Sequence, residues 1–308
     1  MVFWIALLSV LLYLLYKVSE IAERELVKFA ENSGITHLAI GFIFLAAATA
    51  LPELTISVSS AFLGNQEIAV GVSLGNVMYG RVLIIPIVAM LYGLKISETN
   101  FRKILNVSII SLIALFPILF LKEIGRVYGI ALVTSFIILS YFLLSEKPKK
   151  STLSSEGEKL KNKIAIGLSL ISLSFLATLI NISIKYISEI TGISTLTIGS
   201  IFVSIFTSLP ELIVCLHAAK IKNYDIIVGT IYGTLAFDTL FLLGSTSIIA
   251  PIVISNFHNF IILYSFLSVS LISIILMIWK RREIGAYDSI FLLMLLALWI
   301  FLSILIGI

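Results

Sequence analysis

The sequence is poor in charged residues, which make up 12% of its 308 positions, whereas hydrophobic residues make up 59%. A soluble domain carries roughly 25% charged residues. So few charges cannot cover a surface that faces water, and here they gather in short segments between apolar stretches of about 20 residues, the length that crosses a bilayer as a helix. The composition excludes a soluble globular protein and predicts a polytopic membrane protein.

Cysteine and histidine are also scarce. Cys215 lies in an apolar stretch. Because it is the single cysteine, it cannot form an internal disulfide bond. The three histidines, His37, His217 and His258, are scattered, so the sequence offers no Cys or His cluster for a soft metal ion. Ser-His-Asp and metal-hydrolase patterns are missing too. We therefore expect no enzymatic activity, no catalytic residue and no cofactor, and the basic loops do not imply a nucleic-acid partner.

The long apolar runs do not alternate with a period of two, so they predict helices and an all-α polytopic fold. The apolar start lacks the basic beginning and the small-residue cleavage site of a signal peptide, and we interpret it as a retained first span. Charged clusters separate ten predicted spans. These cover residues 2–19, 36–62, 68–93, 104–121, 127–145, 164–184, 194–219, 225–249, 258–279 and 287–307.

One polar segment, residues 146–163, is rich in Lys, Ser and Glu and cannot bury enough apolar area to fold alone. It is predicted to link a first half, residues 1–145, to a second half, residues 164–308. The loops after the odd-numbered spans, together with the adjoining ends of those spans, hold 17 of the 21 lysines and arginines. Because basic loops stay in the cytoplasm, the linker is predicted to be cytoplasmic and both termini to lie outside a cell (plasma) membrane.

The two halves repeat each other. The segment GFIFLAAATALPELTISVSSAFLG from Gly41 matches GSIFVSIFTSLPELIVCLHAAKIK from Gly199, at a constant offset of 158 residues. Because five spans separate the second span from the seventh, these two cross the membrane in opposite directions, which predicts two inverted five-helix repeats. Secondary transporters build a central binding site from such repeats and their broken helices. Matched pairs are Gly34 and Gly192, Pro52 and Pro210, Glu53 and Glu211, and Gly75 and Gly233.

Each repeat carries a proline that breaks its helix, followed by a glutamate. Pro52 and Pro210 lack a backbone donor, which frees carbonyls in the preceding turn. A charged side chain at the centre of a spanning helix costs roughly 2.5–3.5 kcal/mol unless it is paired or solvated, so such a residue is a functional-site hypothesis. Four charged residues lie well inside predicted spans: Glu53, Glu211, Asp238 and Arg81.

Oxygen donors surround these acids at repeat-related positions. They are Thr49, Thr207 and Ser208 before the prolines, and Asn76 and Thr234 after the matched glycines. Carboxylate, hydroxyl, amide and carbonyl oxygens favour a hard cation such as sodium or calcium. Glycines four residues apart thin one face of the third and eighth spans and predict close approach to the broken helices. These glycines are Gly71, Gly75, Gly229 and Gly233.

Arg81 admits two interpretations. In a purely structural network it pairs with Glu53, and the second repeat echoes an ancestral site. In the alternative, the three acids and Arg81 carry a formal charge of −2, which matches one divalent ion, and Arg81 takes the place of a transported monovalent cation. Its position near the middle of a span disfavours snorkelling to lipid headgroups.

These motifs resemble the sodium/calcium exchanger family within the cation/calcium antiporter superfamily. Family repeats carry G-T-S-L-P-E followed by G-N-x-x-G-S-N-x-x-N or G-N-x-x-G-S-N-x-x-D. The matching segments here are A-T-A-L-P-E at 48–53, F-T-S-L-P-E at 206–211, G-V-S-L-G-N-V-M-Y-G at 71–80 and G-T-I-Y-G-T-L-A-F-D at 229–238.

The resemblance implies that Glu53 and Glu211 coordinate calcium and that Asp238 matches the acid or amide of the family site. It also implies oxygen ligands at Thr49, Thr207, Ser208, Asn76 and Thr234, with backbone carbonyls from Ala46 and Ser204. The departures concentrate in the first repeat. Ala50 and Gly80 lack side-chain ligands of the family pattern, and Val72 and Thr230 replace two asparagines.

We therefore predict a secondary active antiporter that exchanges a divalent cation, with calcium as the first choice, for sodium by alternating access. The resemblance implies that the first and sixth spans slide against the other eight. The departures leave proton coupling open, and a non-transporting membrane protein that binds a cation is the remaining alternative. The expected partners are Ca²⁺, Na⁺ or H⁺ and the lipid bilayer, and nothing in the sequence requires more than a monomer.

Overall fold

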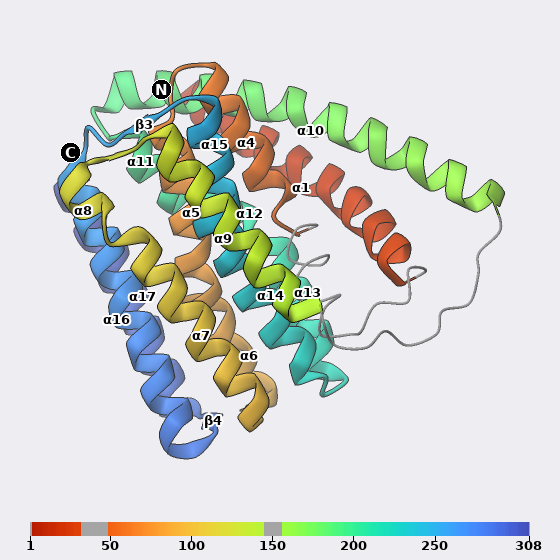
Figure 1. Cartoon of the computed structure of the whole chain (residues 1–308). Helices are drawn as coiled ribbons and strands as arrows, with labels where there is room; N and C mark the ends of the chain where they lie inside the picture. The colour runs from red at the N-terminus through yellow and green to blue at the C-terminus, as the bar shows by residue number, and fades with distance from the viewer. Residues whose placement is uncertain (1, 32–48, 145–155, 308) are drawn as a thin grey trace.

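The computed structural model describes residues 2–31, 49–144 and 156–307. Helices form almost all of this part of the chain (Figure 1). Eight helical segments are long and apolar enough to cross a membrane, and they correspond to the predicted spans one, three, four and six to ten. The all-helical membrane fold is therefore confirmed.

The helices outside the second, third, seventh and eighth spans have these bounds: α1 Val2–Glu31, α7 Glu98–Leu115, α8 Ile118–Leu121, α9 Arg126–Leu144, α10 Glu156–Thr191, α16 Phe257–Arg281 and α17 Ala286–Gly307. The fifth predicted span corresponds to α9, whose apolar segment Arg126–Tyr141 is shorter than the others. The second span is described only in its last part. Helix α10 begins within the predicted linker, so residues 156–163 are helical.

Three spans each contain a short π-helical segment. The third consists of α5 Glu67–Tyr79, the π-helical η2 Gly80–Ile84 and α6 Ile85–Tyr92. The eighth consists of α14 Tyr224–Ala236, the π-helical η4 Phe237–Leu242 and α15 Leu243–Ile249. The seventh runs through α11 Thr195–Ile198, the π-helical η3 Gly199–Val203, α12 Ser204–Thr207 and α13 Leu209–Lys220. The described part of the second span is α4 Leu51–Phe62.

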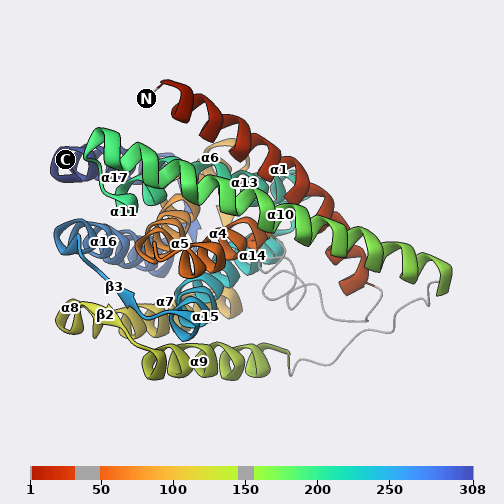
Figure 2. The ribbon, with the colours of Figure 1, turned by 90° about the horizontal axis from the view of Figure 1, so that it is seen from above.

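Helices α1 and α10 lie side by side across one face of the other helices (Figure 2). Their inner faces form an apolar cluster with α4, α5 and the seventh span, and this cluster is separate from the main core. Across the pair, the rings of Trp4 and Tyr186 stack with their centroids 4.5 Å apart. The molecule thus has a two-helix layer that packs on a larger bundle.

Two short antiparallel strand pairs join the halves at opposite ends of the molecule. Strand β1 Leu94–Lys95 pairs with β4 Glu283–Ile284, and β2 Glu123–Ile124 pairs with β3 Ile252–Val253. Figure 1 places β4 at the lower end and β3 at the upper end. Each pair contains one strand from each half of the sequence.

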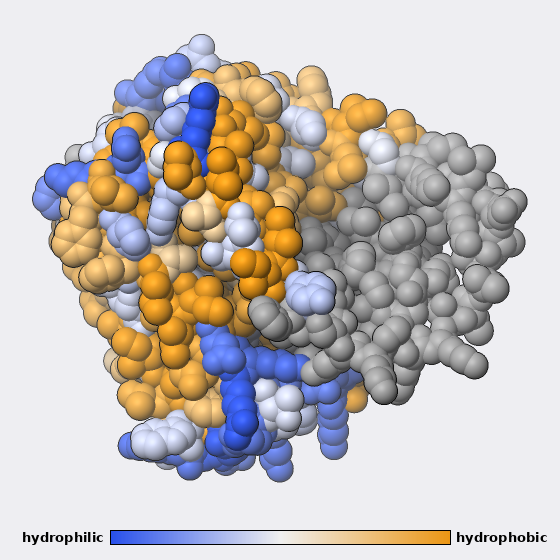
Figure 3. Space-filling model, viewed as in Figure 1, coloured by the Kyte–Doolittle hydropathy of each residue, from blue (hydrophilic) through white to orange (hydrophobic). Residues whose placement is uncertain are grey.

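The surface between the two ends is largely apolar. Figure 3 shows a hydrophobic band, with hydrophilic residues gathered above and below it. Large hydrophobic side chains are exposed on the described helices, and Ile113, Phe175 and Met294 are each more than 60% exposed. An apolar belt of this kind faces lipid.

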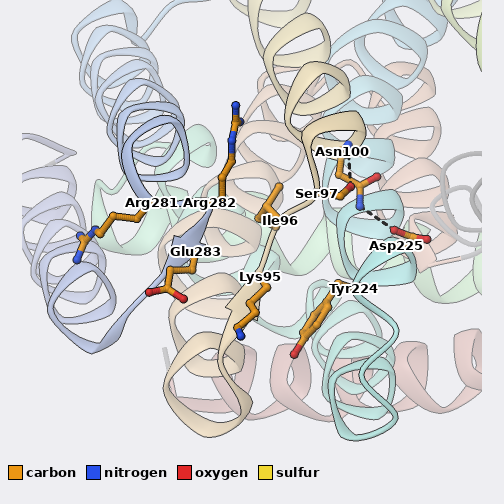
Figure 4. Close-up of a pocket in the computed structure, with 9 residues that line it drawn as sticks. All are labelled: Lys95, Ile96, Ser97, Asn100, Tyr224, Asp225, Arg281, Arg282 and Glu283. Atoms are coloured by element: carbon orange, nitrogen blue, oxygen red, sulfur yellow. Dashed lines mark hydrogen bonds between the residues drawn. The ribbon is translucent and has the colours of Figure 1, made fainter.

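A pocket of about 520 Å³ opens at the end where β1 pairs with β4 (Figure 4). Its lining is charged and polar and includes Lys95, Asp225, Arg281, Arg282 and Glu283. No predicted cation ligand contributes to it. The pocket marks a hydrophilic end of the molecule rather than the site predicted at its centre.

The glycines of α5 allow it to approach the seventh span closely. A Cβ atom added at Gly71 would lie 2.3 Å from the carbonyl oxygen of Leu196. At Gly75, it would lie 2.3 Å from the carbonyl oxygen of Ser200 and 2.4 Å from the hydroxyl of Ser204. The predicted close approach is confirmed for these two glycines, and for Gly229 and Gly233 it stays a prediction.

This contact predicts that Gly75→Ala destabilises the protein. The added methyl group meets backbone atoms that cannot rotate away, so we expect the melting temperature in detergent to fall by several degrees, because overpacking costs about 1–3 kcal/mol. Gly167→Ala in α10 is the matched control, since no heavy atom lies within 4 Å of its added Cβ. An equal melting temperature for Gly75→Ala and the wild type in a thermal scan would contradict the close packing.

Candidate functional site

Two half-helices begin near the middle of the second and seventh spans. Helix α4 follows Ala50 and α13 follows Ser208, and these two residues have similar backbone angles (φ −87°, ψ 8° and φ −79°, ψ −7°). Each helix has a proline at its second position, where the missing N–H costs no helical hydrogen bond. Both helix starts therefore share one geometry.

This geometry places Glu53 and Glu211 in the first turns of α4 and α13. The exposed fractions of their side chains are 0% and 1%, so both carboxyl groups are inside the protein. A helix N-terminus carries unpaired N–H groups and partial positive charge, which favours a carboxylate there by about 0.3–1 kcal/mol. That gain is smaller than the cost of burying an ionised carboxylate, so further compensation is required.

Asp238 is the third buried acid, with a side chain that is 0% exposed at the second position of η4. Asn76 joins it to Glu211: its amide nitrogen Nδ2 donates to Asp238 Oδ2 at 3.1 Å and to Glu211 Oε1 at 3.4 Å. The Glu53 carboxylate interacts electrostatically with both other acids. The structure thus brings Glu53, Glu211, Asp238 and Asn76 into one polar centre.

Several oxygens of this centre have no hydrogen-bond partner within the described part of the chain. They are both carboxylate oxygens of Glu53, Oδ1 of Asp238 and Oδ1 of Asn76. A buried polar atom without a partner costs roughly 1–3 kcal/mol, and a charged one costs more. A bound cation or a proton would compensate the cost of burying these four oxygens in one centre.

Three of the four predicted hydroxyl ligands, Thr207, Ser208 and Thr234, donate to carbonyls of the preceding turn, and Thr207 and Thr234 also adjoin an acid. Thr234 adjoins Glu211 and donates to the Thr230 carbonyl at 2.9 Å, and Thr207 adjoins Glu53. Donation in this direction leaves the hydroxyl oxygen able to accept a cation. Ser208 donates to the Ile205 carbonyl at 3.1 Å.

The remaining predicted ligands differ in how the structure places them. Thr49 is buried, and only Ala50 separates it from the first residue of α4. The Ser204 carbonyl already accepts from the Ser208 N–H at 2.9 Å, while the Ser204 hydroxyl donates to the Val72 carbonyl at 2.9 Å. Ala46 lies outside the described residues.

The acids do not form a closed set of metal ligands. Among residues 49–144 and 156–307, no three His, Cys, Asp or Glu side chains converge closely enough to hold a metal ion. Instead, the Asn76 amide lies between Glu211 and Asp238. A cation bound by all three acids therefore requires side-chain rearrangement, which exchange of the hydrogen bonds of Asn76 would allow.

Arg81 does not pair with Glu53 in the described structure, so the interpretation as a structural network is wrong on this pairing. Its guanidinium donates to the carbonyls of Val77 and Ile231, the latter at 3.4 Å, and lies 5.6 Å from the ring centroid of Tyr232. The Arg81 side chain is 1% exposed, which excludes contact with lipid headgroups. It interacts electrostatically with Glu211 and Asp238.

Sequence reasoning missed three features of the centre. Ser73 donates to the backbone carbonyl of Asp238 at 2.9 Å, and Tyr232 faces Arg81. Neither residue is distinguished by a motif. The π-helical segments η2 and η4 begin at Gly80 and Phe237, and such segments are frequent at functional sites. Their only sequence signal is that both start near the acid position of the repeat.

The chain was compared with known families and proteins. The model of the sodium/calcium exchanger protein family matches residues 3–145 and 162–305. The putative antiporter CaxA of Alkalimonas amylolytica is 26% identical, over 86% of this chain and 87% of its own length. The sodium/calcium exchanger MaX1 of Methanosarcina acetivorans is 22% identical, over 92% of this chain and 93% of its own.

Solved structures of the sodium-calcium exchanger NCX_Mj have the same fold. The one soaked with 2.5 mM Na⁺ and 1 mM Sr²⁺ has a TM-score of 0.67 and 21% sequence identity, with 96% of each chain covered. The inner membrane protein YrbG of Escherichia coli is 24% identical, over 71% of both chains. The similarity extends across both halves of the sequence.

Proposed function

The chain belongs to the sodium/calcium exchanger family, and on this premise we propose that it is a secondary active antiporter that exchanges calcium for sodium by alternating access. The observation that carries the proposal is the set of buried oxygens on Glu53, Asp238 and Asn76 that have no hydrogen-bond partner among the described residues. Oxygens of this kind are the preferred ligands of calcium and sodium. The protein is a multi-pass membrane protein and a transporter rather than an enzyme.

The proposed cation ligands are the carboxylates of Glu53, Glu211 and Asp238, the Asn76 amide oxygen and nearby hydroxyl and carbonyl oxygens. Rotating the Asn76 amide would turn its Oδ1 towards the acids and release Glu211 Oε1 and Asp238 Oδ2 for the ion. The hydroxyl and carbonyl donors are Thr49, Thr207, Ser208 and Thr234, with carbonyls of Ala46 and Ser204.

The two halves are proposed to be inverted five-helix repeats, with ten spans in total. Two observations support this arrangement: the half-helix starts at Ala50 and Ser208 share one geometry, and the strand pairs lie at opposite ends. The β1–β4 end carries Lys95, Arg281 and Arg282 and is proposed to face the cytoplasm, with both termini outside.

The test is counterflux in proteoliposomes that contain the purified full chain. We expect calcium uptake when an outward sodium gradient is imposed with pH equal on both sides. Liposomes without protein and liposomes with Glu53→Gln protein are the controls. Calcium binding without uptake under a sodium gradient or a pH gradient would identify a non-transporting cation-binding protein instead.

Proton coupling is the second candidate. It is favoured by Glu53, whose two buried oxygens have no partner in the described residues, since protonation removes the charge that burial penalises. Ala50 and Gly80 offer no side-chain oxygen to sodium, which also favours protons as the coupling ions. Calcium uptake driven by a pH gradient alone, in sodium-free buffer, would establish this coupling.

A further inference from the structure

We propose that Arg81 is a tethered monovalent cation that makes exchange electroneutral, so that one divalent cation is exchanged for two monovalent cations. The inference rests on the antiport proposed above and adds its stoichiometry. It concerns the charge of the site rather than its ligands, because Arg81 contacts none of the three carboxylates through a hydrogen bond in the described structure.

The surroundings of the guanidinium are those of a bound cation. Two backbone carbonyls, from Val77 on its own span and Ile231 on α14, accept its N–H groups, and the Tyr232 ring lies 5.6 Å away. Carbonyl oxygens and aromatic faces both attract monovalent cations inside membrane proteins. Because arginine stays protonated in proteins, this charge is permanent.

The Arg81 charge attracts the acids without using their oxygens as hydrogen-bond acceptors. Arg81 interacts electrostatically with Glu211 and Asp238, yet Oδ1 of Asp238 and both oxygens of Glu53 have no partner in the described structure. A salt bridge would have used these oxygens as acceptors. Arg81 therefore lowers the net charge of the centre while leaving its oxygens available to the transported ions.

Arg81 also lies next to the position where a ligand is missing. A Cβ atom added at Gly80, the repeat counterpart of Asp238, would lie 4.0 Å from Glu211 Oε2, so a side chain there would reach the acids. The counterpart of Arg81 is Thr239, whose hydroxyl contacts the Leu235 carbonyl and Ser111. The first repeat thus lacks a side-chain ligand at Gly80 and carries a fixed positive charge at the next residue, Arg81.

The charge balance follows from these residues. Three ionised carboxylates and one guanidinium have a net formal charge of −2. One calcium ion neutralises this charge, and so do two sodium ions or two protons, so both loaded forms are neutral and the membrane potential does not drive the cycle. Without the guanidinium the charge is −3, and exchange of one calcium ion for three monovalent ions moves one charge across the membrane.

The experiment measures calcium accumulation at steady state in proteoliposomes, with the potential set by potassium and valinomycin to zero or to 100 mV of either sign. The driving gradient is the one that supports uptake by the wild type. We expect the wild-type accumulation ratio to stay within about twofold at all three potentials. In Arg81→Gln, we expect a change of about 50-fold per 100 mV, because one charge is worth about 2.3 kcal/mol at that potential.

Two further variants separate charge from shape. Arg81→Lys keeps the charge and is expected to remain insensitive to voltage. The double variant Arg81→Gln/Asp238→Asn restores the net charge of −2 and is expected to lose the voltage sensitivity of the single variant, even where its rate is lower. If Arg81→Gln does not fold, the wild type still tests the electroneutral stoichiometry, and the double variant Arg81→Gln/Asp238→Asn still tests whether a net charge of −2 without the guanidinium gives voltage-independent accumulation.

A wild-type accumulation ratio that changes about 50-fold with 100 mV would overturn the inference and leave the antiport function in place. Voltage-independent accumulation by Arg81→Gln would overturn it as well. If the wild type moved no calcium under any gradient, the proposed antiport function would be wrong, and so would the stoichiometry that rests on it.

Discussion

Glu53→Gln is expected to reduce the calcium affinity at least about 100-fold, since even groups that only support metal ligands change affinity 10- to 100-fold. Glu53 is fully buried, and neither of its carboxylate oxygens has a partner in the described structure. Glutamine keeps the size of the side chain but removes the charge and one oxygen acceptor. Isothermal titration of the purified protein with calcium, magnesium, manganese and sodium measures the loss and its ion selectivity.

Glu283→Gln is the matched control for this measurement. Glu283 is an exposed residue of β4, so the same chemical change there removes a solvated carboxylate. We expect its calcium affinity to equal that of the wild type. If Glu53→Gln bound calcium as tightly as Glu283→Gln, the ion would have to bind elsewhere and the proposed site would be wrong.

The fold was predictable because the bilayer imposes a simple pattern. Apolar stretches of about 20 residues separated by charge located eight spans that the structure contains. The interruption before α13 was also predictable, since Pro210 cannot donate to the preceding turn. The helical start of α10 inside the predicted linker was not, because composition alone does not reveal that residues 156–163 extend a long helix whose later part is stabilised by packing.

The site was predictable only where the repeat pointed to it. A constant offset identified Glu53 and Glu211, and the structure brings Glu211, Asp238 and Asn76 into contact. The partner of Arg81 was not predictable, since pairing of opposite charges suggested Glu53 while the guanidinium is held by Val77 and Ile231 carbonyls. Backbone carbonyls have no residue-specific signal, so tertiary contacts with them are invisible in one sequence.

A disulfide bond between α4 and α10 is expected to stop transport. The proposed motion slides α1 and α10 against the remaining helices, and α10 contacts α4 through a hydroxyl pair, Ser59 and Thr178, whose oxygens are 3.2 Å apart. Cysteines at these positions place two sulfur atoms within reach of bonding. In a Cys215→Ser background, we expect oxidation of Ser59→Cys/Thr178→Cys to reduce calcium flux to the level of empty liposomes, and a reductant to restore it.

The matched control links two elements that the proposed motion carries together. Ser111 of α7 and Thr239 of η4 belong to the larger bundle, and their hydroxyl oxygens are 3.1 Å apart. We expect Ser111→Cys/Thr239→Cys to transport calcium equally well in oxidised and reduced forms. Calcium titration of the oxidised α4–α10 variant should still detect binding, because the bond blocks movement and leaves the acids in place. Full transport by that variant, with the disulfide verified by mass spectrometry, would show that α10 does not slide against α4 and that alternating access uses a different boundary.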